Sequence, residues 1–197
     1  MKEKPQNIGL FFGSFNPIHN GHLMIANYLV SNCDLDQIWF VISPCNPLKQ
    51  KQSLLDEHHR LALVKIAIDG NTSFRASDIE FKLSQPSYTT HTLAYLLEKY
   101  PQKQFSLIMG ADNLETIEKW KNYQHILDNF PIYVYPRPNA KIEKWNCFPS
   151  IHITDSPMID LSSSFIRKQI SDGKSIRYLM PDEVIKYIEE MHFYKPK

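Results

Sequence analysis

Residues 8–22 read IGLFFGSFNPIHNGH, and this stretch decides the fold class of the chain. Residues 8–12 form a short apolar run that is typical of a buried strand, and Gly13 follows the run at a turn. From Asn20 onward apolar residues recur at helical spacing, so we expect a helix to begin there. A buried strand, a glycine-containing loop and a helix are the first unit of an alternating α/β sheet.

The rest of the chain continues the alternation of short apolar runs with amphipathic segments. Further strands are expected at residues 38–42, 105–109, 132–135 and 151–154, with an extended segment at 74–81. Helices are expected at residues 54–67, 90–100, 123–130, 162–171 and 182–191. This order predicts a doubly wound α/β fold with a mostly parallel sheet, in a single domain over residues 1–197 that closes with C-terminal helices. We expect the turn-rich stretch 136–149 to be a mobile surface loop.

Composition excludes several classes of function. The 197 residues include 22 Lys and Arg against 21 Asp and Glu, and a net charge of +1 creates no global field for nucleic acid or an anionic membrane. Every apolar run falls short of the ~20 residues of a membrane span, and the charged N-terminus lacks a signal-peptide core, so we expect a cytoplasmic protein. Three cysteines without C-x-x-C spacing argue against a zinc site. The formation of a homo-oligomer stays open.

The loop after the first strand predicts an anion site. Gly13 lets the backbone turn and approach a phosphate closely, and the first amides of the following helix attract anions. His19 and His22 are three residues apart, so they project from one helix face and would flank the same anion, as donors or as imidazolium. The alternatives are a capped helix with two surface histidines and a metal site. We expect no metal, because no third ligand lies near the pair in sequence.

A second phosphate site is predicted at residues 161–167, which read LSSSFIR. Serines at a helix start cap free amides, and capping alone would explain Ser162 or Ser163. Ser164 and Arg167, however, are three residues apart on one helix face. An arginine fork beside hydroxyl groups at an amide-rich helix end suits a phosphate, and we prefer this interpretation.

Further features are weak signals when each is taken singly. The stretch QPSYTT at residues 85–90 precedes an expected helix, Gly110-Ala111-Asp112 follows an expected strand, and Trp120 comes ten residues after the glycine. Lys49 and Arg137 also follow expected strands, at the edge of the sheet where ligands bind in such folds.

Together these motifs resemble the nucleotidyltransferase superfamily. Residues 19–22 match its H-x-G-H signature, and residues 161–167 are similar to its I-S-S-T-x-I-R motif. The P-S-Y-T, G-x-D and late Trp features, with the segment 178–184, resemble bacterial nicotinate-nucleotide adenylyltransferases over nearly the whole chain. The resemblance implies a Rossmann-like fold and the transfer of AMP from ATP to nicotinate mononucleotide, with release of pyrophosphate and with Mg²⁺ bound to ATP.

The resemblance also implies roles for individual residues. His19 would meet the α-phosphate and His22 the departing phosphates, so both are predicted catalytic residues, together with Arg167. Trp120 would stack on the pyridine ring, and Asp112 would lie near a ribose. The predicted ATP-binding residues are Gly13, Ser14, Phe15, Asn16, His19, His22, Ser163, Ser164, Phe165 and Arg167. The predicted mononucleotide-binding residues are Lys49, Ser87, Tyr88, Thr89, Gly110, Asp112, Trp120 and Arg137.

Several positions depart from the family's pattern. Ser14 and Asn16 stand where Gly and Asp are common, and Ser164 replaces a Thr while keeping the hydroxyl. Asn16 keeps a polar side chain but lacks the carboxylate. Leu48 replaces a His beside Lys49, which removes one phosphate contact.

Three rival functions stay open at this point. Pantetheine-phosphate adenylyltransferases share the first motif but would not explain the P-S-Y-T and Trp features. A dual-specificity enzyme would use nicotinate and nicotinamide mononucleotides alike, and a non-catalytic regulator would bind a nucleotide without turning it over. For a strict nicotinate enzyme we expect the free amides of the helix after residues 87–90 to recognise the carboxylate without Lys or Arg.

Overall fold

The computed structural model describes residues 5–44 and 54–196, which fold around one parallel sheet. Within these residues six strands follow the order β3-β2-β1-β4-β5-β6, and every neighbouring pair is parallel. The strands are β1 (Gln6–Gly13), β2 (Gln37–Ile42), β3 (Phe74–Ser77), β4 (Lys103–Gly110), β5 (Ile132–Tyr135) and β6 (Ile151–Ile153). The predicted doubly wound α/β class is confirmed. The order of strands reverses between β1 and β4, and ligands in such sheets bind at the carboxyl ends of the strands beside that reversal.

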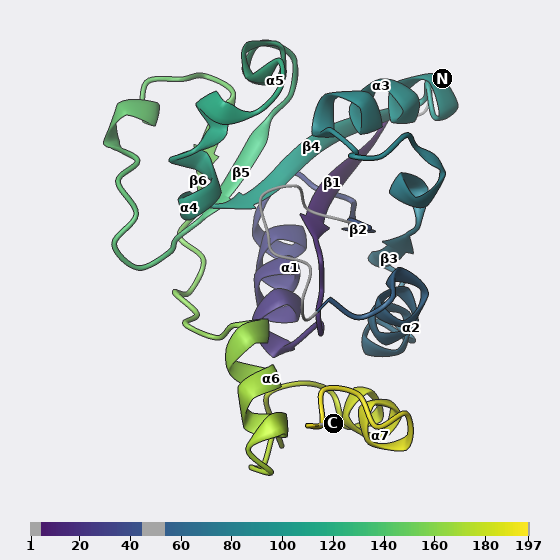
Figure 1. Cartoon of the computed structure of the whole chain (residues 1–197). Helices are drawn as coiled ribbons and strands as arrows, with labels where there is room; N and C mark the ends of the chain where they lie inside the picture. The colour runs from purple at the N-terminus through teal and green to yellow at the C-terminus, as the bar shows by residue number, and fades with distance from the viewer. Residues whose placement is uncertain (1–4, 45–53, 197) are drawn as a thin grey trace.

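Helices cover both faces of the sheet (Figure 1). They are α1 (Asn20–Asn32), α2 (Glu57–Ala67), α3 (Thr89–Lys99), α4 (Ala111–Leu114), α5 (Tyr123–Asn129), α6 (Ser163–Ser171) and α7 (Asp182–Glu190). The described residues also include the short 3₁₀ segments η2 (Ile79–Lys82), η3 (Ile117–Lys119) and η4 (Glu143–Trp145). Figure 1 shows α6 and α7 together at one end of the molecule, next to α1 and α2.

The hydrophobic core consists of two layers, because side chains of a strand alternate between the faces of the sheet. In β1, Ile8 and Leu10 pack in the layer under α3 and α5, whereas Phe11 packs in the layer under α1 and α2. In β2, Trp39 belongs to the first layer and Phe40 to the second. All five side chains are at most 3% exposed, so burial on both faces explains why these strands read as continuous apolar runs.

Two expected element boundaries differ from the structure for local reasons. Helix α2 begins at Glu57 rather than at residue 54, because the Asp56 side chain accepts a hydrogen bond from the His58 amide at 2.9 Å and caps the helix there. The extended segment expected at 74–81 ends at Ser77. The chain turns there into η2, which buries Ile79 in the core and also buries Glu80.

The stretch 136–149, expected as a mobile surface loop, has a buried anchor. Trp145 lies in η4 and is only 2% exposed, because its ring packs into the core layer under α3 and α5. Phe148 packs against Trp145 with ring centroids 5.1 Å apart. A buried tryptophan ties the second half of this otherwise largely exposed stretch to the core, and its mobility stays a prediction.

The described residues contain neither a membrane-spanning helix nor a metal-binding cluster. No helix among them is long and apolar enough to cross a membrane. Within residues 5–44 and 54–196, no group of three or more His, Cys, Asp or Glu side chains could hold a metal ion.

Candidate active site

The loop after β1 turns at Phe15 rather than at Gly13. Phe15 has a φ of 44°, a left-handed conformation that is costly for a residue with a side chain. Its ring folds back over Gly13, where a Cβ atom would lie 2.8 Å from the ring. The ring also packs edge-on against Phe40 at 5.5 Å and His22 at 5.1 Å. Gly13 is therefore needed for the close approach of the Phe15 ring, and not for the turn that the sequence suggested.

The two histidines of the first motif lie on one face at the start of α1, as the spacing predicted. Their rings stack with centroids 3.8 Å apart and planes inclined by 26°. The backbone amide of His19 donates to Nδ1 of His22 at 3.3 Å, which places the proton of neutral His22 on Nε2. A Cβ atom on Gly21 would lie 3.0 Å from Nδ1 of His19, so the glycine between the histidines makes room for the stacked pair.

His19 is neutral at physiological pH when no ligand is bound. His19 is only 2% exposed. Burial lowers the pKa of its imidazole to about 4, with a smaller contribution from the positive charge of Arg137. The spacing of the two histidines was compatible with either a neutral donor or an imidazolium at this position. The structure favours the neutral imidazole until an anion arrives, because a nearby negative charge would raise the pKa again.

The second motif is attached to the first by hydrogen bonds. Arg167 donates to the Asn16 carbonyl at 2.8 Å and to Oγ of Ser164 at 3.3 Å. The Ser163 hydroxyl donates to the Pro17 carbonyl at 2.8 Å, across 146 residues of sequence. These bonds bring the N-terminal end of α6 against the loop that precedes α1.

The individual serines of the second motif differ in role. Ser162 caps α6, since its Oγ accepts from the Phe165 amide at 3.2 Å, which confirms the capping interpretation for this serine. Ser164 is exposed, and so is Phe165 at 48%. Their side chains are therefore accessible from solvent, beside the guanidinium of Arg167.

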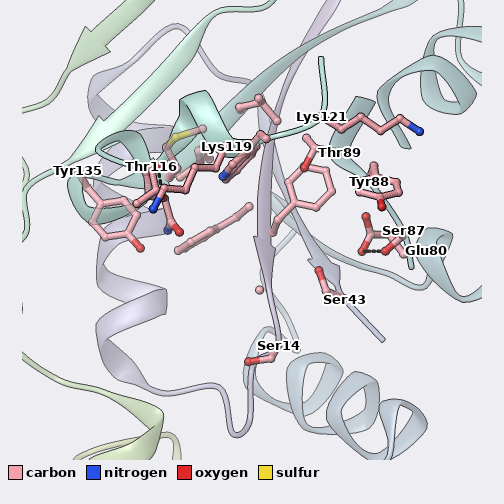
Figure 2. A pocket seen from close by; sticks show the side chains of 18 residues that line it. Ser14, Ser43, Glu80, Ser87, Tyr88, Thr89, Thr116, Lys119, Lys121 and Tyr135 are labelled. Atoms are coloured by element: carbon pink, nitrogen blue, oxygen red, sulfur yellow. Dashed lines mark hydrogen bonds between the residues drawn. The ribbon is translucent and has the colours of Figure 1, made fainter. Parts of the chain in front are cut away.

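A cavity of about 280 Å³ opens at the carboxyl ends of β1, β2 and β4 (Figure 2). In Figure 2, Ser14 and Ser43 lie on one side of it, Ser87, Tyr88 and Thr89 on another, and Thr116, Lys119 and Tyr135 on a third. The predicted site residues that line it are Gly13, Ser14, Ser87, Tyr88, Thr89 and Trp120. The lining residues that sequence reasoning did not select are Phe11, Phe12, Ser43, Glu80, Leu107, Ile108, Met109, Asn113, Thr116, Lys119, Lys121 and Tyr135.

Glu80 orders the turn that enters α3. It is 3% exposed, and its carboxylate accepts hydrogen bonds from the Thr92 hydroxyl at 2.7 Å and the Ser87 hydroxyl at 3.1 Å. Burial raises the pKa of Glu80, and the hydroxyl hydrogen bonds oppose that rise. The turn at Ser87 is therefore fixed to η2 and to the first turn of α3.

The start of α3 faces the cavity, and the ammonium of Lys121 lies beside it. Tyr88 is the N-cap residue, and its side chain makes no capping hydrogen bond to the first-turn amides. The Lys121 ammonium lies 4.6 Å above the Tyr88 ring, and Lys119 also lines the cavity, on the other side of Trp120 in sequence. We expected the helix amides alone to supply the positive end of this site, whereas in the structure the lysines on both sides of Trp120 also line the cavity.

Gly110, Asp112 and Arg137 gather at the ends of β4 and β5, outside the cavity lining. The Arg137 guanidinium lies 3.8 Å from the Asp112 carboxylate and donates to the Ile159 carbonyl at 3.2 Å. A Cβ atom on Gly110 would collide with the Asp112 carboxylate and would lie 3.2 Å from Cγ of Arg137. Arg137 also influences His19 electrostatically, so this group adjoins the histidine pair. Lys49, with Leu48, lies outside the described residues.

Arg60 is the main structural residue that sequence reasoning missed. It is fully buried and donates to the backbone carbonyls of Ser14 at 2.6 Å, Ser43 at 2.8 Å and Pro44 at 3.0 Å. It thereby holds the ends of β1 and β2 together at the edge of the cavity. One sequence feature could have indicated its role. Arg60 is a charged residue on the apolar face of a helix, one turn before Val64.

Asn16 needs no negative charge for its contacts. Its Oδ1 accepts from the Leu55 amide at 3.2 Å and from the Tyr194 hydroxyl at 2.8 Å. An amide oxygen serves both donors, so the replacement of the family's Asp by Asn is compatible with this geometry.

The chain is similar to known proteins over nearly its whole length. Residues 10–169 match the family model described as cytidylyltransferase-like. A protein of Flavobacterium johnsoniae that carries the name "Probable nicotinate-nucleotide adenylyltransferase" is 53% identical over 190 residues, which are 95% of this chain and 98% of the relative. A protein of Bacillus licheniformis with the same name is 37% identical, over 96% of this chain and 99% of the relative.

Solved structures show the same fold. The nicotinic acid mononucleotide adenylyltransferase of Plasmodium falciparum, complexed with NaAD, superimposes with a TM-score of 0.81 at 23% identity, covering 96% of this chain and 97% of that chain. A structure from Vibrio parahaemolyticus gives a TM-score of 0.73 at 21% identity, with coverages of 98% and 97%.

Proposed function

The chain belongs to the nicotinate-nucleotide adenylyltransferase family, and from that premise we propose that it transfers AMP from ATP to nicotinate mononucleotide, giving nicotinate adenine dinucleotide and pyrophosphate. One observation carries the proposal: the cavity and the histidine pair share the carboxyl end of β1. Gly13 and Ser14 line the cavity, and His19 and His22 follow at the start of the next helix. A mononucleotide in the cavity would thus have its phosphate near the site proposed for the triphosphate.

The proposed reaction is an in-line attack of the mononucleotide phosphate on the α-phosphorus of ATP. A phosphate monoester is already nucleophilic at neutral pH, so no residue has to be activated and no covalent enzyme intermediate is needed. The main difficulty is the positioning of two polyanions. His22 Nε2 and the Arg167 guanidinium would donate hydrogen bonds to the phosphates. These bonds would stabilise the negative charge that develops as pyrophosphate leaves.

Magnesium is proposed to enter with ATP. The described residues include no cluster of carboxylates or other ligands that could form a protein cage for the ion. The nearby carboxylate of Asp112 already faces the Arg137 guanidinium. The ion would neutralise phosphate charge, while the residues of this chain bind and orient the nucleotides.

Recognition of the nicotinate ring is proposed to occur at the start of α3. The first-turn amides after Tyr88 favour an anion there, and Trp120 supplies a flat apolar face for the ring. Lys119 and Lys121 add positive charge to the same lining. A carboxylate suits these donors, whereas the NH₂ group of nicotinamide would leave buried donors unpaired, at a cost of ~1–3 kcal/mol.

A pyrophosphate-release assay with a panel of acceptors tests the proposal. With Mg-ATP, nicotinate mononucleotide should be used at least ~10-fold better than nicotinamide mononucleotide, and phosphopantetheine should not be used. Product identity can be checked by mass spectrometry. Pyrophosphate release with phosphopantetheine alone would favour the pantetheine-phosphate enzyme, and dinucleotide binding without any release would favour a regulator.

A further inference from the structure

The C-terminal tail, at residues 191–196, contacts the loop of the first motif. The Tyr194 hydroxyl donates a hydrogen bond of 2.8 Å to Oδ1 of Asn16, across 178 residues of sequence. Figure 1 shows the C-terminus beside α6 and α7, at the end of the molecule where α2 also lies. The contact therefore joins the chain's last turn to the loop between β1 and α1.

Asn16 is the point at which three separate parts of the chain meet. Its Oδ1 accepts from the Leu55 amide at 3.2 Å as well as from Tyr194, and its carbonyl accepts from Arg167 at 2.8 Å. The Leu55 amide can only donate, so the amide oxygen of Asn16 must face both donors. Burial raises the pKa of Tyr194, so its hydroxyl keeps its proton and remains a donor.

The tail that presents Tyr194 is itself held in place. The Phe193 amide donates to the Ile188 carbonyl at 3.0 Å, and the Phe193 ring packs on His59 of α2 at 4.8 Å. This packing brings the Tyr194 side chain to the loop from a fixed direction.

The loop requires such support because it contains a strained residue. Phe15, next to Asn16, has a φ of 44°, and a residue in this region persists only where its surroundings hold it, at a cost of roughly 1–3 kcal/mol. We propose that Tyr194 is a positioning residue for the ATP-binding loop, acting through Asn16 from the C-terminal tail. This inference rests on the proposed function only in taking the loop at residues 13–17 as part of the ATP site.

Tyr194→Phe tests the inference, because it removes the hydroxyl and keeps the ring. Tyr187→Phe is the matched control: it removes a hydroxyl from the same C-terminal aromatic group but not one that contacts the loop. For both variants we would measure Mg-ATP affinity by calorimetry without acceptor, the KM values for both substrates, and the thermal unfolding midpoint.

We expect Tyr194→Phe to weaken ATP binding and raise the KM for ATP by about three- to tenfold, the range of one hydrogen bond. The KM for nicotinate mononucleotide should change less than about twofold, and Tyr187→Phe should leave ATP affinity as in the wild type. ATP affinity equal in the two variants, or an equal rise of both KM values, would overturn the inference. So would a fall of the unfolding midpoint with unchanged ATP affinity, which assigns Tyr194 to stability alone.

A double-mutant comparison decides whether Tyr194 acts through Asn16. In an Asn16→Ala background, Tyr194→Phe should cost no further ATP affinity, because the acceptor of its hydrogen bond is already gone. An undiminished loss in that background would overturn the inference. These binding measurements do not depend on the acceptor: if the wild type makes no dinucleotide, the proposed function fails, while the ATP comparison still decides the role of Tyr194.

Discussion

The imidazole rings of His19 and His22 stack with centroids 3.8 Å apart, and only one of the two residues is buried almost completely. Two positive charges at this separation would repel each other, and burial already holds His19 neutral. The pair is therefore suited to a ligand that brings several negative charges of its own. A triphosphate is such a ligand.

His22→Ala should lower turnover by ~10² or more without unfolding the protein. The Nε2 proton of His22 is the donor that the stacked pair offers to developing phosphate charge, and loss of one such donor costs factors of this size. His19→Ala should behave similarly. Steady-state assays, with circular dichroism to confirm folding, measure the effect, and near-normal turnover of a folded double variant would contradict it.

Stability should fall at acidic pH because of His19. Burial lowers its pKa to about 4, while the unfolded chain retains a value near 6.5, so below pH 6.5 the unfolded state binds the proton first. The free energy of unfolding therefore decreases as pH falls from 6.5 to 4. Since each pKa unit corresponds to ~1.4 kcal/mol, the loss due to His19 is about 3 kcal/mol.

The measurement for His19 is urea unfolding of ligand-free protein at several pH values. His19→Gln serves as the reference, because other groups also titrate in this range and their contributions cancel in the comparison. The wild type should lose about 3 kcal/mol more than the variant between pH 6.5 and 4. Parallel curves for the two proteins would show that His19 titrates normally.

Arg167→Lys should weaken ATP binding. The guanidinium donates at once to the Asn16 carbonyl and to the Ser164 hydroxyl, and an ammonium cannot reproduce this planar fork. Lys168→Arg is a suitable control on the same helix, since Lys168 pairs with Asp172 on the exposed side. Calorimetry without turnover should show a loss for Arg167→Lys alone, and unchanged affinity would reduce Arg167 to a surface charge.

Glu80→Gln should raise the KM for nicotinate mononucleotide by about three- to tenfold and leave ATP affinity unchanged. The carboxylate accepts from both Ser87 and Thr92, whereas an amide has one oxygen and would leave one hydroxyl without its acceptor. Glu98→Gln, at the exposed end of α3, is the matched control. If the KM for ATP rises instead, Glu80 does not act on the turn at Ser87.

Local sequence patterns were sufficient for the fold and for the first motif. The run at residues 8–12 is apolar because β1 is buried on both faces, and the H-x-G-H spacing places two rings on one helix face. The pattern of apolar residues also predicts most of the strands. It does not predict the end of β3, because η2 forms where Glu80 and its hydroxyl partners fix the chain, and those partners lie in α3 and in the turn before it.

Long-range contacts account for what the sequence did not reveal. Arg60 and Tyr194 contact the loop after β1 from α2 and from the C-terminal tail, and neither belongs to a local motif. Lys121 lies over the Tyr88 ring only in the folded chain, and Lys119 lines the same cavity. Such residues need three-dimensional neighbours to be recognised, because no spacing rule links positions that are 46 or 178 residues apart.

The most direct test of the account compares kcat/KM for nicotinate and nicotinamide mononucleotides in the wild type and in Trp120→Ala. We predict a preference for nicotinate of at least ~10-fold in the wild type, which is about 1.4 kcal/mol. Trp120→Ala should weaken the use of both substrates and change their ratio little, because the ring face is indifferent to the substituent and the amides at the start of α3, with Lys121 beside them, discriminate. Equal use of both substrates by the wild type would contradict the assignment of nicotinate mononucleotide as the specific acceptor.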